Sequence, residues 1–189
     1  AWGGAQERYG VVPDLCTLGK IIGGGMPLAA IAGRESIMRH FDEKAVGEEG
    51  FTFQIGTLSG NPLAAVAGLA TLDVLDRPGS YERLTEVGTR LMKAAHAALD
   101  AVGIPHQIVG DPTLFDVIFT VNPVLNYRDI MAADSQRAAV FNTAMRSRGI
   151  LKPGAKTYPH LALDEADILQ TIDAYGYAAG QVAAMPAAS

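Results

Sequence analysis

The chain has 189 residues, of which 49% are hydrophobic and 19% charged, and its formal net charge is -5. This balance is typical of a globular protein with one large domain or parts of two. The negative charge and the scattered basic residues argue against nucleic acid as a partner, and no apolar run is long enough to span a membrane. The single cysteine, Cys16, excludes an internal disulfide framework and indicates a reducing, cytoplasmic location.

The sequence begins with Ala1 and a Gly-rich stretch that lacks both the charged segment and the apolar core of a signal peptide. We therefore expect it to be a fragment of a longer protein. The first part has the strand–loop–helix pattern of an α/β layer. The predicted elements are a loop over residues 1–14, a buried strand over 15–18, a second strand over 28–32, a short helix over 34–41 and a surface loop over 42–50.

A longer helix is predicted to begin at Asn61-Pro62, because asparagine is a good N-cap and proline fits the first helical position. Its mostly apolar surface indicates burial on several sides. The remaining residues predict a compact α+β unit. Its elements are a helix over 81–102, strands over 107–109 and 115–121, a helix over 136–148 that ends at Gly149, a short strand over 150–151 and a final helix from Asp164 to about residue 183.

The densest chemical signal is the run PDLCTLGKIIGGGMP over residues 13–27. Lys20 follows a short apolar strand and precedes two isoleucines and three consecutive glycines. Apolar neighbours favour a neutral amine, which is the form that attacks a carbonyl to make a Schiff base. The glycines let the backbone turn sharply and approach a flat ligand. A Gly-Lys pair by itself is more often a surface lysine beside a turn.

Two phosphate-binding loops are excluded at this run. A Walker A loop requires glycine and Ser or Thr at the places that Asp14 and Ile21 occupy. The dinucleotide-binding fingerprint, counted from Gly23, requires a glycine where Leu28 stands.

The whole run closely resembles the lysine segment of class III aminotransferases, which depend on pyridoxal 5'-phosphate (PLP), above all in the glutamate-1-semialdehyde aminomutase branch. The resemblance implies that Lys20 holds PLP as a Schiff base and shuttles protons. It implies an α/β fold, the C-terminal part of a fold-type I PLP-dependent transferase. Residues 1–76 would end the large PLP-binding domain, and residues 77–189 would form the small C-terminal α+β domain.

A second motif, GTLSGNP over residues 56–62, is a small-residue loop that leads into a helix, which suits an anion. Without the first motif, a helix cap with a flexible lead-in would be the simpler interpretation. It resembles the family segment in which a threonine binds the cofactor phosphate of the neighbouring subunit. By this resemblance Gly56 and Thr57 are phosphate ligands across a homodimer interface. The implied substrate is a small amino acid or amino-aldehyde.

The motifs do not distinguish an aminomutase from an aminotransferase, and GTLSGNP slightly favours the first. In the family, the acidic partner of the pyridine nitrogen lies upstream of the lysine, and Asp14 is too close to Lys20 to be that residue. We therefore expect the chain alone to have little or no transaminase activity. The rival interpretation is a non-catalytic α/β module that binds a phosphate-bearing ligand or a partner.

The other candidate residues are weaker. Four histidines lie far apart in the sequence, without the spacing of a metal site, so we predict no metal centre; they are His40, His96, His106 and His160. His160 stands where many relatives have serine, and we expect it to be a partly buried residue at the start of the last helix. Lys152 and Lys156 are weak candidates for binding a substrate carboxylate.

Overall fold

The computed structural model describes residues 1–186. The chain divides into two compact units, Ala1–Tyr81 and Glu82–Ser189, and each is described by itself. Among the described residues, no helix combines the length and the apolar character that crossing a membrane would require.

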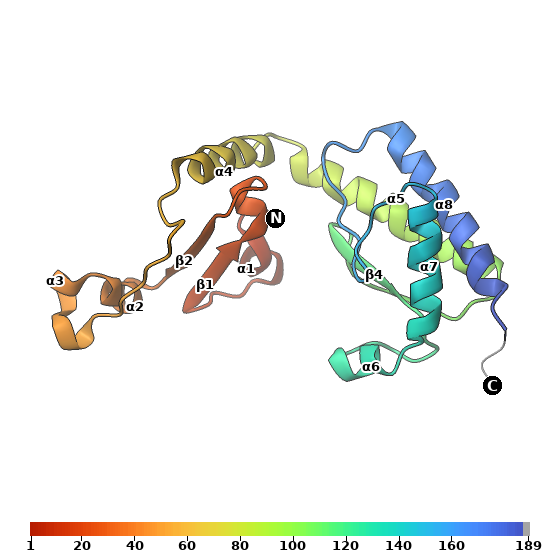
Figure 1. Ribbon diagram of the computed structural model, residues 1–189, viewed down its shortest axis with the longest axis horizontal. Coiled ribbons are helices and arrows are strands. Elements are labelled where there is room, and N and C mark those ends of the chain that lie inside the picture. Colours follow the sequence, from red (N-terminus) through yellow and green to blue (C-terminus); the bar gives the residue numbers. More distant parts are fainter. Residues whose placement is uncertain (187–189) are drawn as a thin grey trace. The chain divides into compact units, whose positions relative to one another are not determined.

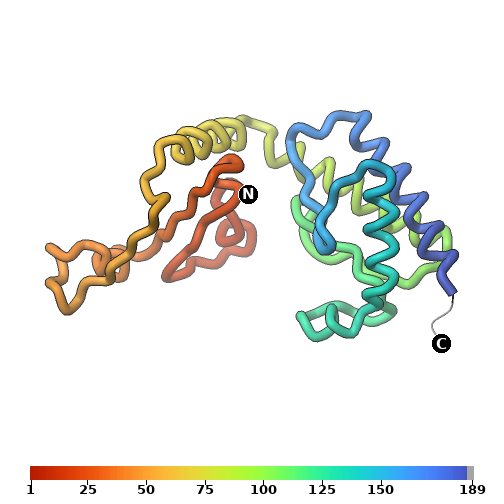
Figure 2. Tube along the Cα trace, in the orientation of Figure 1, coloured from red at the N-terminus to blue at the C-terminus, as the bar shows by residue number. Residues whose placement is uncertain are grey.

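The first unit combines one β-hairpin with short helices and one longer helix, α4 (Figure 1). Its elements are α1 (Gly4–Tyr9), β1 (Leu15–Gly19), the 3-10 helix η1 (Lys20–Gly23), β2 (Ala29–Gly33), α2 (Glu35–Met38), η2 (Arg39–Phe41), α3 (Glu43–Val46), η3 (Glu48–Gly50) and α4 (Pro62–Leu75). Residues 51–61 run without helix or strand from η3 to α4 (Figure 2).

The two predicted strands are confirmed to within one residue. Strands β1 and β2 pair antiparallel, with Leu15 opposite Gly33 and Gly19 opposite Ala29. Their predicted burial is wrong in this chain, because Leu15 and Leu18 are 46% and 43% exposed. A two-stranded hairpin has two faces, and the described residues of this unit cover neither completely.

The predicted loops over residues 1–14 and 42–50 are wrong in part. Helix α1 forms over Gly4–Tyr9 and ends at Gly10, whose φ of 65° is left-handed. Helix α3 begins after Asp42, whose side chain accepts a hydrogen bond from the Lys44 N–H. In both places glycines begin, end or flank the short helical turns, as Gly4 and Gly10 do for α1 and Gly47 does for α3, so composition alone suggested a loop.

Helix α4 begins as predicted. The Asn61 side chain accepts hydrogen bonds from the N–H groups of Leu63 (2.9 Å) and Ala64 (3.3 Å). Only Ala64 and Gly68 of this helix are buried, so the prediction of burial on several sides is wrong for this chain.

The second unit packs three helices with a β-hairpin. Its elements are α5 (Ser80–Ala101), which begins two residues before the unit boundary, β3 (Gln107–Asp111), β4 (Leu114–Ile118), α6 (Tyr127–Met131), α7 (Ser135–Ser147) and α8 (Glu165–Ala183). Strands β3 and β4 pair antiparallel, and α7 packs against α8 (Figure 1). Helices α5, α7 and α8 confirm the predicted helices to within about two residues.

The core of the second unit draws on every one of its larger elements. Helix α5 contributes a stripe four residues apart, consisting of Val87, Leu91, Ala95 and Leu99. This spacing places the four side chains on one helical face. The ring of Phe141 on α7 lies 5.5 Å from that of Phe119 after β4 and 6.0 Å from that of Tyr175 on α8. These rings join the hairpin side of the core to both helices.

Of two further predictions for this unit, one is confirmed and the other is wrong. Gly149 has a φ of 81°, as expected of the glycine that ends α7. The short strand predicted over residues 150–151 does not form. Instead the backbone of Phe115 pairs with that of Thr157 in an isolated antiparallel bridge. The short helix α6, which begins with a capping box at Asn126, was not predicted.

Candidate cofactor-binding site

Lys20 lies at the junction of β1 and η1 and has an unusual backbone conformation. Gly19 before it is fully extended, whereas Lys20 itself has a φ of 54°, in the left-handed region. Among the described residues, only Lys20 and Lys156 adopt positive φ without being glycine. Such a conformation costs roughly 1–2 kcal/mol for an ordinary residue. It persists where the surroundings impose it, and such residues cluster at functional sites.

The loop after Lys20 is closed by local hydrogen bonds. The Gly24 N–H donates to the carbonyl of Ile21 (3.2 Å), and the Met26 N–H donates to that of Gly23 (2.9 Å). Gly24 and Gly25 have φ values of 57° and 88°, which other residues rarely adopt. The glycine run therefore forms two tight turns between Lys20 and strand β2.

The loop after Lys20 packs against helix α4. A Cβ atom on Gly68 of α4 would lie 2.5 Å from the carbonyl oxygen of Ile22 in η1. In the other direction, a Cβ on Gly24 would lie 2.5 Å from the Ala67 carbonyl oxygen. The loop and the helix are therefore in backbone contact, and a larger residue at either glycine would separate them. Two glycines thus set the position of the segment that begins at Lys20.

The amine of Lys20 is not enclosed by apolar side chains in this chain. Lys20 is exposed, and its neighbour Ile21 is 66% exposed. The expectation that apolar neighbours surround the amine is therefore wrong for the described residues. What the structure supports at this position is the strained, glycine-flanked backbone and the accessibility of the amine.

The segment with Gly56 and Thr57 forms two consecutive turns before α4. The Ser59 N–H donates to the Gly56 carbonyl (2.9 Å), and the Asn61 N–H donates to the Leu58 carbonyl (3.2 Å). Gly56 and Thr57 are both exposed.

The first turn of α4 offers little to an anion, contrary to the general expectation for a helix start. Pro62 has no N–H group, and the N–H groups of Leu63 and Ala64 both bind the Asn61 side chain. Donors for a phosphate group would therefore have to come from the preceding loop, where Gly56 and Thr57 are exposed.

Two other candidates from the sequence, His160 and Lys152, do not form a binding site. His160 is exposed, and its carbonyl accepts a hydrogen bond from the Leu163 N–H (3.2 Å) just before α8. Lys152 is buried, at 8% exposure, with its Nζ 3.1 Å from the Pro153 carbonyl oxygen and 3.9 Å from a carboxylate oxygen of Asp116. Burial lowers the pKa of Lys152, and the Asp116 carboxylate opposes that effect. The amine of Lys152 therefore already has a hydrogen-bond partner and an acidic neighbour inside the second unit, so it is a poor candidate for binding a substrate carboxylate.

Sequence spacing missed one cluster of side chains. His96 and His106, taken as distant from each other, lie 2.7 Å apart between ring nitrogens.

Comparison with known proteins identifies the family. The model of the class III aminotransferases matches residues 2–172. The chain belongs to the class III aminotransferases. Among curated proteins, it is 45% identical over 177 residues to a glutamate-1-semialdehyde 2,1-aminomutase of Sorangium cellulosum, covering 92% of this chain and 39% of that protein. It is 41% identical over 182 residues to the protein of that name from Thermus thermophilus, covering 94% of this chain and 42% of that protein.

Solved structures of transaminases share the fold. An omega-transaminase from Sphaerobacter thermophilus matches with a TM-score of 0.84 and 31% identity, over 95% of this chain and 41% of that one. A transaminase solved with PLP bound matches with a TM-score of 0.82 and 25% identity, over 97% of this chain and 42% of that one. The class III chain described here thus spans about 40% of the length of these relatives. Its fold is part of the α/β fold of fold-type I PLP-dependent transferases.

Proposed function

We propose that this chain is part of a PLP-dependent enzyme that moves an amino group between carbons, with Lys20 as the residue that binds the cofactor. The observation that carries the proposal is the left-handed backbone of Lys20 at the end of β1, followed by a loop whose Ile22 and Gly24 pack closely against α4. The names of the relatives include both aminomutases and transaminases. Of the two reactions we slightly favour that of the aminomutase, because the GTLSGNP motif is more similar to that branch.

The residues present fit the cofactor in two respects. PLP carries an aldehyde, which requires an accessible amine, and the exposed Lys20 supplies one. PLP also carries a phosphate, which requires accessible N–H and hydroxyl donors, and the exposed Gly56–Thr57 segment supplies them. Residues 1–76 would then be the end of the large PLP-binding domain, and residues 77–189 the small C-terminal domain.

When bound, PLP supplies an electron sink for the bonds at the amine-bearing carbon of a substrate. The Nζ of Lys20 would be the group that holds the aldehyde end of the cofactor. The same Nζ would accept and return protons at the substrate carbon. Lys20 would therefore act both as the attachment point and as the acid–base group.

Thr57 and Gly56 would bind the phosphate of the partner subunit in a homodimer. This arrangement does not require Lys20 and Thr57 of one chain to meet, because each would serve a different site. The substrate would be a small amino acid or amino-aldehyde. We place the enzyme in the cytoplasm, where its single cysteine, Cys16, would stay reduced.

Trapping the cofactor by reduction tests the role of Lys20. The purified chain is incubated with PLP, reduced with borohydride and mapped by mass spectrometry. We expect the reduced adduct on Lys20 and its loss in the K20A variant. The matched control is K44A, which removes another exposed lysine of the same unit and should leave the adduct unchanged.

Replacing Thr57 by valine, which has the same shape but no hydroxyl, tests the phosphate site. We expect T57V to weaken PLP retention, and T52V, which changes another exposed threonine, to have no effect. Labelling spread equally over several lysines would show that Lys20 is an ordinary surface lysine. PLP retention that depends on Thr57 without an adduct on Lys20 would instead favour the rival, a non-catalytic phosphate-binding module.

A further inference from the structure

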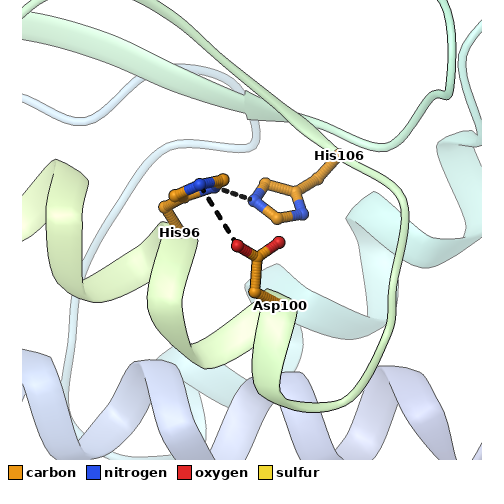
Figure 3. A group of neighbouring side chains, drawn as sticks. All are labelled: His96, Asp100 and His106. Atoms are coloured by element: carbon orange, nitrogen blue, oxygen red, sulfur yellow. Dashed lines mark hydrogen bonds and ion pairs between the residues drawn. The ribbon is translucent and has the colours of Figure 1, made fainter.

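Three side chains with metal-binding atoms gather in the second unit, at the end of α5 and the start of β3: His96, Asp100 and His106 (Figure 3). His96 and Asp100 are four residues apart on α5, so they project from the same helical face. Their ring and carboxylate atoms approach to 3.2 Å, between Nε2 of His96 and Oδ2 of Asp100. His106 comes from the segment that returns over this face.

The turn after α5 fixes the position of His106. The N–H groups of Gly103 and Ile104 donate to the carbonyls of Asp100 (2.9 Å) and Leu99 (3.0 Å), which closes the helix end. Gly103 has a φ of 67°, so it can take the left-handed position that reverses the chain. Pro105 then restricts the backbone immediately before the histidine. The cluster is therefore built on a helix and a closed turn and not on a free loop.

The hydrogen bonds determine which ring nitrogens carry protons. A carbonyl oxygen can only accept, so Nδ1 of His106, 2.8 Å from the Ile104 carbonyl, must donate. In a neutral imidazole this leaves Nε2 of His106 with a free lone pair. Nδ1 of His96 lies 2.7 Å from that atom and donates to it. Nε2 of a neutral His96 then also carries a lone pair.

That lone pair of His96 faces the Asp100 carboxylate, which likewise can only accept when ionised. Two electron-rich atoms 3.2 Å apart are stabilised only by a positive charge shared between them. A proton or a metal ion can supply that charge. On the other side of the His96 ring, Nε2 of His106 accepts the hydrogen bond from Nδ1 of His96. It can become a third ligand of a metal ion once rotation of the His96 ring gives up that hydrogen bond, whereas a single proton shared with Asp100 needs only two atoms.

We propose that His96, Asp100 and His106 form a binding site for a divalent transition-metal ion such as Zn²⁺. Each residue offers one ligand atom, and the three atoms lie within 4.8 Å of one another. Ligands of tetrahedral zinc, bound at about 2.0–2.1 Å, lie roughly 3.3–3.5 Å apart. The spacing between His96 and Asp100 already approaches this value. The side chains of both are 59% exposed, so they can rotate to bring His106 into the same shell.

The kind of metal follows from the donors. Two imidazoles and one carboxylate suit zinc and its neighbours, whereas Mg²⁺ and Ca²⁺ prefer oxygen ligands throughout. The Ile104 carbonyl is the outer partner that holds the His106 ring in its metal-binding tautomer. Three protein ligands leave a fourth position for water. The bound ion would link the end of α5 to the start of β3.

This site does not depend on the proposed PLP chemistry. Its three residues belong to the second unit, whereas Lys20, Gly56 and Thr57 belong to the first. The metal can therefore be tested in the absence of PLP.

Titration of the metal-free full chain with ZnCl2, followed by calorimetry, is the direct test. We expect one zinc ion per chain. H96Q and H106Q should each weaken binding at least tenfold, and D100N should weaken it by a smaller factor. The matched control is H160Q, which removes an exposed histidine outside the cluster and should bind zinc as the unmodified chain does.

Thermal unfolding distinguishes a loss of zinc binding from a loss of folding in the variants. In EDTA, H96Q and D100N should unfold at the same temperature as the unmodified chain, because both side chains are largely exposed. Added zinc should raise that temperature most for the unmodified chain and H160Q, less for D100N and least for H96Q. If the unmodified chain did not bind zinc, or if H96Q and H106Q bound it as tightly as the unmodified chain does, the proposal would be overturned, and the cluster would be a hydrogen-bonded group that shares a proton.

Discussion

The guanidinium of Arg90 on α5 and the carboxylate of Glu165, the first residue of α8, form two parallel hydrogen bonds of 2.7 and 2.6 Å. Such forked pairing fixes direction as well as distance. Glu165 also lies in the first turn of α8, where a negative charge is favoured. The pair therefore joins two helices that are far apart in the sequence, at the surface of the second unit.

The hydrogen bond from Arg90 lowers the pKa of Glu165. A carboxylate with a lowered pKa stabilises the fold above its unfolded value of 4.5, and this stabilisation is lost as pH falls through the folded value. We therefore expect E165Q to unfold at a lower temperature than the unmodified chain at neutral pH, and the difference to vanish below the lowered pKa. Thermal unfolding over pH measures this. E86Q, which breaks the Arg83–Glu86 pair within α5, should have a smaller effect.

Gly88 on α5 is a second point of contact in the same unit. It is buried, and a Cβ atom there would overlap the backbone carbonyl of Pro112 in the turn between β3 and β4. We expect G88A to lower the free energy of unfolding by about 1–3 kcal/mol or more, because a backbone group cannot move aside easily. Urea unfolding measures the change.

The control for that change is G176A on α8, where a Cβ would meet no other atom within 4 Å. Alanine is the better helix former, so G176A should raise the free energy of unfolding by roughly 0.5–1 kcal/mol. If both variants behaved alike, the contact between Gly88 and Pro112 would be absent in solution.

Gly68 on α4 allows the position of the Lys20 loop to be tested separately from the stability of the helix. In G68A the new Cβ would press on the Ile22 carbonyl, while alanine itself favours the helix. We expect G68A to keep α4 helical by amide hydrogen exchange but to reduce the yield of the PLP adduct on Lys20. A65S, an exposed change on the same helix, should leave the yield unaltered.

Buried Lys152 predicts a pH dependence on the alkaline side. Because burial lowers its pKa below 10.5, the native chain releases this proton at a lower pH than the unfolded chain does. Stability should therefore rise with pH between the lowered value and 10.5. K152M should lack this rise when urea unfolding is compared at several pH values. An identical pH dependence in both proteins would mean that Lys152 is solvated in the native state.

Features that depend only on residues close together in the sequence could be predicted from it. The N-cap at Asn61, the helix over residues 81–102 and the sharp glycine turns after Lys20 were all readable from short stretches, because capping, periodicity and glycine turns act over a few residues. The pairing of His96 with His106 was not, since it depends on how the turn at Gly103 folds back onto α5. The exposure of α4 and β1 was not predicted either. An apolar face indicates that a surface favours burial, but it does not say which residues cover it.

The distribution of buried side chains has a consequence for calorimetry. Of the fully or nearly fully buried hydrophobic residues, Ala64 alone belongs to the first unit, and all the others described belong to the second. Ordering a residue costs about 1–2 kcal/mol of backbone entropy, which apolar burial must offset. The heat absorbed on melting this chain should therefore come mostly from the second unit. A ligand that stabilises the first unit should increase the measured enthalpy, a signal that a melting temperature alone would miss.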